Sequence, residues 1–562
     1  MKSINIFKTR CYSIAFLALG SLLITMTMTS CQNKKQKADL ILINGTVYTV
    51  NADFSECQAF AVNNGKFIAT GTNEEILNQF ESAQVYDAQA KPVYPGFIDG
   101  HCHFFGYGEN LIRYAELAGS QSFDEVIARL EAHNKAHPSE WILGRGWDQN
   151  RWTDKQFPDN RLLEEHFPGK KIFLIRIDGH AVLVSKSALE AAAITAKTKV
   201  EGGEVQLLAD GTPSGILIDK AEEAVKALIP ALTIEEKKAA LMAAQDACFA
   251  VGLSGVVDAG LPLDKIKLID SLQKDGALKM KINAMLDPDE TTLGHYLEKG
   301  PFHSDKLSVT AVKMYADGAL GSRGAWLLEP YSDDVQNTGL MLFADEFYET
   351  ICKRAYDAGF QVNMHAIGDQ ANRYVLELYS RFLEEDNDRR WRVEHAQIVH
   401  PDDFKLFSKY NIIPSIQSTH ATSDMLWAPG RIGEERMKTA YAQQQLMDQN
   451  GWLINGTDFP IEGINPLETF YSAVFRKNAD GVPENGFQME NALSRENALR
   501  SITIWAAKGH FEEDIKGSIE VGKAADFVVL DHDILEAEEQ QLKQTKVVKL
   551  IISGEEVYNA GN

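Results

Sequence analysis

The long middle of this chain alternates apolar, strand-like runs with helical stretches, and this alternation constrains the fold more than any other feature. Such alternation is typical of βα units around a parallel sheet. Helical patterns cover residues 344–358, 369–384, 402–410 and 435–449, and eight runs resemble strands: 93–103, 254–260, 279–286, 310–316, 361–366, 391–396, 412–417 and 452–456. Because eight parallel strands can close on themselves, the sequence predicts an α/β fold with a (β/α)8 TIM barrel over residues 93–517.

An unusually long segment, about residues 105–250, separates the first predicted strand from the second. Connections of that length normally carry structure of their own. We therefore expect a large insertion after strand one, lying over the barrel mouth.

Both ends of the chain are rich in short apolar runs of strand character. In the first of these regions, Asn44-Gly45 and Asn63-Asn64-Gly65 separate such runs and are typical hairpin signals. The C-terminal region has the same pattern of short apolar runs. We predict that residues 38–92 and 518–562 together form one small β-sandwich domain.

The N-terminus has the pattern of an export signal. Basic residues precede an apolar run at 13–25, which is followed by small and hydroxylated residues and then by Cys31. This resembles a bacterial lipoprotein signal, which implies a signal peptide at 1–30, lipidation of Cys31 and a polar tether at 31–37. The expected location is the cell envelope, with the protein anchored to a membrane by lipid and facing the periplasm or the cell surface. Plain secretion and an uncleaved anchor are the alternatives.

Composition excludes some classes of function. The formal net charge is −23, so no basic surface is available to displace counterions from nucleic acid. The cysteines are too sparse for a disulfide framework and are expected to be free buried thiols. We expect a small-molecule substrate and no nucleic-acid partner.

Side chains that can bind metal stand at the ends of several predicted strands, where the active site of a barrel lies. His101 and His103 are two residues apart, so in an extended chain they point the same way. The full candidate set is His101, His103, Lys313, His365, His395 and Asp458. Neutral imidazoles with a carboxylate suit a divalent ion, most naturally zinc, with one or two per chain.

Such a centre has a definite chemistry. A bound ion lowers the pKa of its water to roughly 7, which gives a hydroxide nucleophile at neutral pH. Asp458 can accept the proton and pass it to a leaving nitrogen, so Asp458 and His395 are the expected catalytic residues. The competing interpretations are a helix cap for Asp458 and hydrogen-bonded pairs for the histidines.

Five more residues are candidates for substrate binding: His180, His420, Arg323, Trp147 and Asp148. Each histidine could instead be a satisfied core residue. Cys102 lies between two potential ligands and is expected to point away from them, whereas Asp99 is expected to orient a ligand or cap the loop.

The motifs resemble the amidohydrolase superfamily, and within it amidohydrolase family 3, the subgroup of N-substituted formamide deformylase. They occur in order over about residues 38–535: PGFIDGHCHF, RIDGHAVLVSKSAL, KMYADGALGSR, HAIGDQA, VEHAQ, QSTHATSD, GTDFP and GSIEVGKAADFVVLD. The resemblance implies a barrel with a β-sandwich, a homodimer, N-carboxylation of Lys313 to bridge two metals, and Asp458 as the catalytic aspartate. Thr457 and Gly324 depart from the usual Ser and Thr, and the second departure concerns the substrate pocket.

The sequence thus predicts a metal-dependent hydrolase that cleaves carbon–nitrogen bonds other than peptide bonds, in amide or formamide substrates, by attack of a metal-bound hydroxide. An esterase or cyclic-amide hydrolase on the same scaffold is the main alternative, because a fold does not determine a reaction. A non-catalytic envelope binding protein is the third hypothesis.

Overall fold

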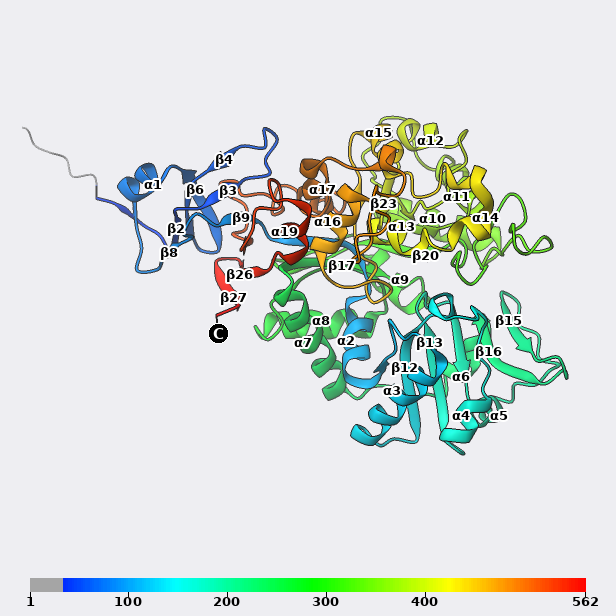
Figure 1. Ribbon diagram of the computed structural model, residues 1–562. Coiled ribbons are helices and arrows are strands. Elements are labelled where there is room, and N and C mark those ends of the chain that lie inside the picture. Colours follow the sequence, from blue (N-terminus) through cyan, green and yellow to red (C-terminus); the bar gives the residue numbers. More distant parts are fainter. Residues whose placement is uncertain (1–33, 562) are drawn as a thin grey trace, which may run out of the picture.

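The computed structural model describes residues 34–561, so the predicted signal peptide and Cys31 lie outside the described part. Figure 1 shows a strand-rich lobe formed by the two ends of the chain, a central α/β body, and a second lobe in cyan and green that lies against that body. None of the described helices is both long enough and apolar enough to cross a membrane.

The central body is the predicted barrel, and the fold prediction is confirmed. Its strands are parallel neighbours in the order β10, β17, β18, β20, β21, β22, β23, β24. Their bounds are Phe97–Cys102, Leu253–Leu261, Lys281–Leu286, Leu307–Tyr315, Gln361–Ala366, Arg392–His395, Ile413–Ile416 and Ile454–Asn455, and the short β19 (Phe302–His303) pairs with β20. The first predicted strand proved to be two, because the chain breaks at Gly96 and β9 (Pro92–Pro95) joins a terminal sheet instead.

The seam between the first and last barrel strands is closed by loops that carry predicted ligands. The Asp458 N–H donates to the His101 carbonyl at 2.8 Å, and the His103 N–H donates to the Phe459 carbonyl at 2.8 Å. Glycine permits this approach, since a Cβ on Gly456 would lie 2.5 Å from the His101 nitrogen. Closing the barrel therefore brings these three side chains to one place.

Helices cover the outside of the barrel between its strands (Figure 1). They are α8 (Leu263–Lys274), α9 (Glu290–Leu297), α10 (Asp345–Ala358), α11 (Asp369–Tyr379), α12 (Phe404–Lys409), α13 (Ser418–Asp424), α14 (Ala428–Met437), α15 (Gln443–Asn450), α16 (Pro466–Phe475), α17 (Arg495–Ser501) and α18 (Ile504–Lys508). The single helix predicted at 435–449 was wrong. The chain breaks there because Tyr441 takes φ 55° and donates its N–H to the Gln397 carbonyl, which ties the break to a barrel loop.

The insertion carries its own mixed sheet, in the order β11, β12, β13, β14, β16, β15. These strands are Ala115–Glu116, Trp141–Trp147, Lys171–Arg176, Ala181–Val184, Pro213–Asp219 and Gly203–Leu207, with helices α3 (Phe123–Ala136), α4 (Arg161–His166), α5 (Lys186–Ala191) and α6 (Glu223–Lys226). The flanking helices α2 (Phe104–Arg113) and α7 (Ile234–Ala250) pack together, since a Cβ on Gly108 would lie 2.1 Å from the Ala240 carbonyl oxygen. The expected insertion at 105–250 thus begins and ends with helices α2 and α7, and its sheet covers only the part from β11 to β16.

Two terminal sheets face each other across a core that contains Phe60, Phe67 and Phe527. One sheet has the order β6, β5, β2, β8 (Lys66–Gly71, Ala59–Asn63, Leu40–Ile43, Val85–Asp87). The other has the order β27, β26, β25, β9, β3, β4 (Glu555–Asn559, Val547–Ile552, Phe527–Leu530, Pro92–Pro95, Thr46–Tyr48, Glu56–Cys57), with α19 (Glu539–Gln544) between β25 and β26 and α1 (Asn73–Gln79) after β6.

Two local expectations for the N-terminal region differ from the structure. Asn63-Asn64-Gly65 does join the paired strands β5 and β6, but Asn44-Gly45 joins β2 to β3, which belong to different sheets. This turn carries the chain from one sheet of the sandwich to the other, and both flanking strands contribute to the core between the sheets. Residues Gln36–Lys37, expected in a tether, form strand β1 and pair with β7 (Phe80–Glu81).

Candidate metal centre

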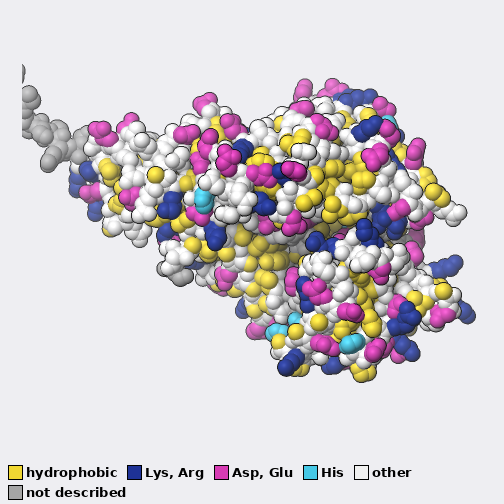
Figure 2. Space-filling model, in the orientation of Figure 1, with side chains coloured by type: hydrophobic (Ala, Val, Ile, Leu, Met, Phe, Trp, Pro, Cys, Tyr) yellow, Lys and Arg dark blue, Asp and Glu magenta, His cyan; other side chains and the backbone are white. Residues whose placement is uncertain are grey.

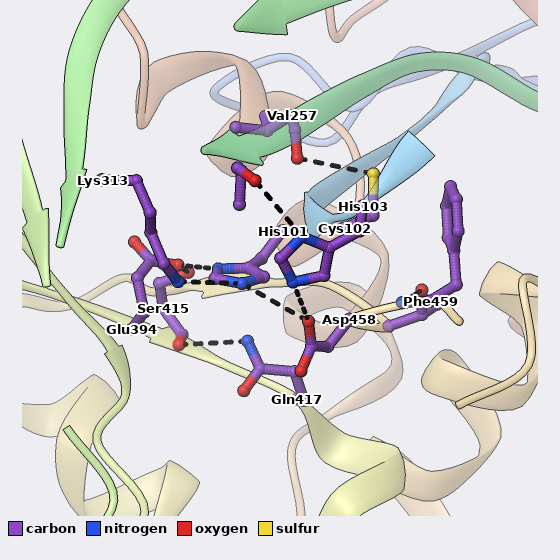
Figure 3. Close-up of polar contacts among 12 residues, drawn as sticks. His101, Cys102, His103, Val257, Lys313, Glu394, Ser415, Gln417, Asp458 and Phe459 are labelled. Atoms are coloured by element: carbon purple, nitrogen blue, oxygen red, sulfur yellow. Dashed lines mark hydrogen bonds and ion pairs between the residues drawn. The ribbon is translucent and has the colours of Figure 1, made fainter. Parts of the chain in front are cut away.

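Predicted ligands meet at the carboxyl end of the barrel, and Figure 3 shows four of them, His101, His103, Lys313 and Asp458. His101 is the penultimate residue of β10, His395 ends β22, and Asp458 follows β24. One ligand atom from each of these three buried residues lies within 4.8 Å of the others. The strand ends and the barrel seam bring these three side chains together.

The tautomer and orientation of His101 are set by Glu394, which sequence reasoning missed. The Nδ1 of His101 contacts the Glu394 carboxylate, and that carboxylate also accepts from Arg392 Nε at 2.7 Å and from the Ser415 hydroxyl at 2.8 Å. Arg392 and Glu394 are fully buried. With Nδ1 engaged, the Nε2 lone pair of His101 faces the cluster, which is the usual supporting arrangement for a metal-binding histidine.

His103 lies on the other side of Asp458. Its Nδ1 lies 3.2 Å from the Ala259 carbonyl oxygen, and its Nε2 lies 3.2 Å from Asp458 Oδ1. Burial raises the pKa of Asp458, but the contacts with His103 and His420 outweigh it and hold that pKa well below its usual value. Asp458 is therefore a carboxylate, as a metal ligand or a proton acceptor must be.

Buried polar atoms without hydrogen-bond partners converge here, which is the test of whether a metal fits. Among the described residues, Nε2 of His365, Nδ1 of His395 and Oδ1 of Asp458 make no hydrogen bond of proper geometry, although Asp317 lies 3.5 Å from the first and His103 lies 3.2 Å from the last. The rings of His365 and His395 lie 4.5 Å apart, and burial lowers both pKa values well below the ordinary value. Neutral imidazoles keep a lone pair for a cation, so these residues fit a divalent ion.

The backbone at two of these residues is in an uncommon conformation. His395 has φ 72° and Asp458 has φ 58°, both in the left-handed region that residues with a side chain rarely adopt. Asp99 holds the second of them in place, because its carboxylate accepts from the Thr457 hydroxyl at 2.7 Å and from the His101 N–H at 3.1 Å. Such conformations gather at functional sites, where surrounding contacts over-determine them.

Lys313 lies in β20 beside the cluster and is completely buried. Its Nζ is 3.3 Å from His101 Nε2 and 4.6 Å from the centre of the Tyr315 ring, and burial lowers its pKa to about 8. No carboxylate oxygen among residues 34–561 lies within the 4.0 Å ion-pair distance of this amine. Lys313 is thus an amine directed at the centre without a partnering acid.

A cavity of about 1150 Å³ opens between the barrel mouth and the insertion and contacts His365, His395 and Asp458. Figure 2 shows the surface indented where the lower lobe meets the body. Of the predicted substrate-binding residues, His180, His420 and Asp148 line this cavity. The insertion therefore forms one wall of the site.

The other two predicted substrate-binding residues are not in the cavity wall, and these predictions were wrong. A register shift between Arg145 and Trp147 turns Trp147 into the core of the insertion, where its indole N–H donates to the Leu174 carbonyl at 2.9 Å. Arg323 pairs with Asp333 at 2.9 Å, which holds its guanidinium outside the cavity. A short motif could not reveal either effect.

The two cavity histidines are held by acids. His180 Nδ1 lies 2.8 Å from Asp219, and His420 lies 3.2 Å from Glu462 and 3.4 Å from Asp458. Burial lowers the pKa of both rings, but these carboxylates outweigh it and raise it to about 9 for His180 and about 10 for His420. His180 therefore keeps one ring nitrogen for a molecule in the cavity, whereas both ring nitrogens of His420 contact acids.

Asp317 is a second supporting residue that sequence reasoning missed. It is fully buried, accepts from the N–H groups of Ile367, Gly368 and Trp326 at 2.8–3.0 Å, and lies 3.5 Å from His365 Nε2.

Cys102 was interpreted correctly, since its thiol is free and turns away to the Val257 carbonyl (Figure 3).

The comparison with known protein families agrees with this geometry. The amidohydrolase family model matches residues 84–558. The chain belongs to the amidohydrolase family. The resemblance read from the sequence motifs is therefore confirmed, and the protein is a metal-dependent hydrolase of that family.

Individual relatives are similar over nearly their whole length. The chain is 29% identical to the putative amidohydrolase YtcJ of Bacillus subtilis, with 92% of this chain and 98% of YtcJ covered. It is 25% identical to N-substituted formamide deformylase of Arthrobacter pascens, with 92% and 98% covered. A crystal structure of an uncharacterized metal-dependent hydrolase from Pyrococcus horikoshii has 28% identity and a TM-score of 0.73, over 89% of this chain and 99% of that one.

Proposed function

We propose that this amidohydrolase cleaves carbon–nitrogen bonds other than peptide bonds, in amide or formamide substrates. The observation that carries the proposal is the buried cluster of His101, His395 and Asp458, which opens into a cavity large enough for a small organic molecule. The similarity to N-substituted formamide deformylase supports the choice of bond.

The cluster has the parts for hydrolysis without a covalent enzyme intermediate. His101, His103, His365, His395 and Asp458 would hold the divalent ion, most naturally zinc, which supplies a Lewis acid for the carbonyl and acidifies water. Asp458 accepts a proton from the attacking water and returns it to the departing nitrogen. His180 contacts the cavity with only its Nδ1 engaged, by Asp219, so its Nε2 would orient the substrate carbonyl, whereas His420 contacts Glu462 and Asp458 and would hold the Asp458 carboxylate in place beside the substrate.

We further propose that Lys313 is N-carboxylated and bridges two ions. In that modification the neutral Nζ bonds to the carbon of carbon dioxide and loses one proton, which converts the amine into an anionic oxygen ligand. The buried position of Lys313 beside His101, with no acid partner, supports this.

The metal content of the purified protein tests the role of Lys313. In buffer containing bicarbonate we expect about two ions per chain by elemental analysis, because a bridging carbamate holds a second ion. Lys313→Met should bind about one ion. If wild-type and Lys313→Met proteins contained equal metal, the bridge would be ruled out.

Substrate panels test the bond that is cleaved. We expect the metal-loaded enzyme to release aniline from formanilide and related amides, to lose this activity on chelation and to regain it with zinc. Turnover by the metal-free protein would contradict the proposal. Nitrophenyl esters tested in parallel address the alternative: hydrolysis of esters far faster than of every amide would identify an esterase on the same scaffold.

A further inference from the structure

Arg145 is a cation in the cavity wall that forms no ion pair with any side chain of residues 34–561. It lies in β12 of the insertion and contacts the same cavity as His395 and Asp458. Its Nε and Nη2 are buried without a hydrogen-bond partner, and no carboxylate among residues 34–561 lies within the 4.0 Å ion-pair distance. A desolvated charge without a partner is costly, so its retention calls for a ligand.

Two acids of the insertion that influence Arg145 electrostatically are already engaged. Glu116 accepts from the Ala118 N–H at 2.7 Å, and Asp178 contacts Arg176 Nη1 at 2.5 Å. Arg176, the other buried arginine of this wall, also pairs with Asp148 at 2.9 Å and is thereby neutralised. Arg145 therefore differs from Arg176 in having no acid partner, so its guanidinium is available to a molecule in the cavity.

The surroundings of Arg145 match this role. Burial lowers its pKa, and the negative charge of Asp458 is the strongest influence that opposes this effect. Arg145 and the cluster residues His395 and Asp458 line the same cavity. A ligand spanning the cavity could place its scissile carbonyl at the cluster and a second group at Arg145.

We propose that the substrate is an amide bearing a carboxylate and that Arg145 binds this carboxylate. The inference rests on the proposed function and adds the class of substrate. A guanidinium presents a planar fork of donors that matches a carboxylate with two parallel hydrogen bonds. Arg145 then acts as a specificity residue and takes no part in bond cleavage.

Binding measurements test this independently of turnover. Calorimetric titration compares N-benzoylglycine with N-benzoylglycinamide, which lacks the charge, and with N-benzoylaminomethylphosphonate, which carries a different anion. We expect wild-type protein to bind the carboxylate roughly 10- to 100-fold more tightly than the amide, the range of charge-assisted hydrogen bonds. Arg145→Met should remove this preference and leave the affinity for the amide within about 3-fold. Tighter binding of the phosphonate than of the carboxylate would assign the subsite to phosphate-like groups and overturn the carboxylate proposal.

Arg151→Met is the matched control, because Arg151 contacts the same cavity but is exposed at its rim. It should retain the preference. Arg145→Lys keeps the charge without the fork and should recover part of the affinity. Equal binding of the carboxylate and the amide by wild-type protein would overturn the inference, as would an equal loss in both variants.

Turnover separates the two proposals. Hydrolysis of N-formylphenylalanine and N-formylphenethylamine at equal kcat/KM would overturn the role of Arg145 while the amidohydrolase proposal stands. Carboxylate-dependent binding with no amide hydrolysis in the metal-loaded enzyme would keep the subsite and overturn the assigned reaction.

Discussion

Replacing both His101 and His103 with alanine is expected to remove the bound metal and abolish measurable turnover. His101 contributes one atom to the buried cluster, and its Nδ1 is already fixed by Glu394, so no other side chain can take its position. His103 lies two residues further along the chain, and its Nε2 lies 3.2 Å from Asp458 Oδ1. Loss of metal then removes the Lewis acid on which the reaction depends. Elemental analysis and an amide-release assay on the same preparation provide the measurement.

The control for this double variant is a second pair of histidines. His133 and His137 lie in the insertion with ring centroids 5.1 Å apart, and neither contacts the cavity. Their double alanine variant should keep full metal content and turnover. If the His101/His103 variant retained both metal and activity, the cluster would not be the catalytic centre.

Asp458→Asn is expected to lower kcat by about 10²- to 10⁴-fold, the usual contribution of a positioned acid–base group. The amide matches the carboxylate in shape but cannot accept a proton at neutral pH. His420 and His103 both contact this side chain, so the loss of its charge also removes one acid from each of them, although His420 keeps its contact with Glu462. Steady-state kinetics with metal content measured in parallel separates loss of proton transfer from loss of the ion.

Asp480→Asn provides the comparison, because Asp480 contacts the same cavity but is exposed and does not belong to the buried cluster. It should change kcat by less than about 2-fold, as surface substitutions generally have small effects. An Asp458→Asn enzyme with wild-type kcat would show that another group moves the proton.

The barrel and the meeting of three candidate metal ligands at its carboxyl end were readable from the sequence alone. Strand periodicity located the eight strands, and barrel topology requires their carboxyl ends to meet, so His101, His395 and Asp458 were placed together without any knowledge of contacts. Glu394 was also within reach, because it follows Arg392 by two residues in an apolar strand and so shares its face. Sequence reasoning passed over that signal.

The tertiary structure alone decided the substrate cavity. A bulge in β12 turned Trp147 into the core, while Arg145 remained in the cavity wall. Arg323 forms an ion pair with Asp333 instead of lining the cavity. The strands on either side of Asn44-Gly45 belong to different sheets of the sandwich. The physical reason is one of range. Strand ends follow from local periodicity and a repeating topology, whereas the direction of a side chain in an insertion depends on bulges and ion pairs made with residues distant in the chain.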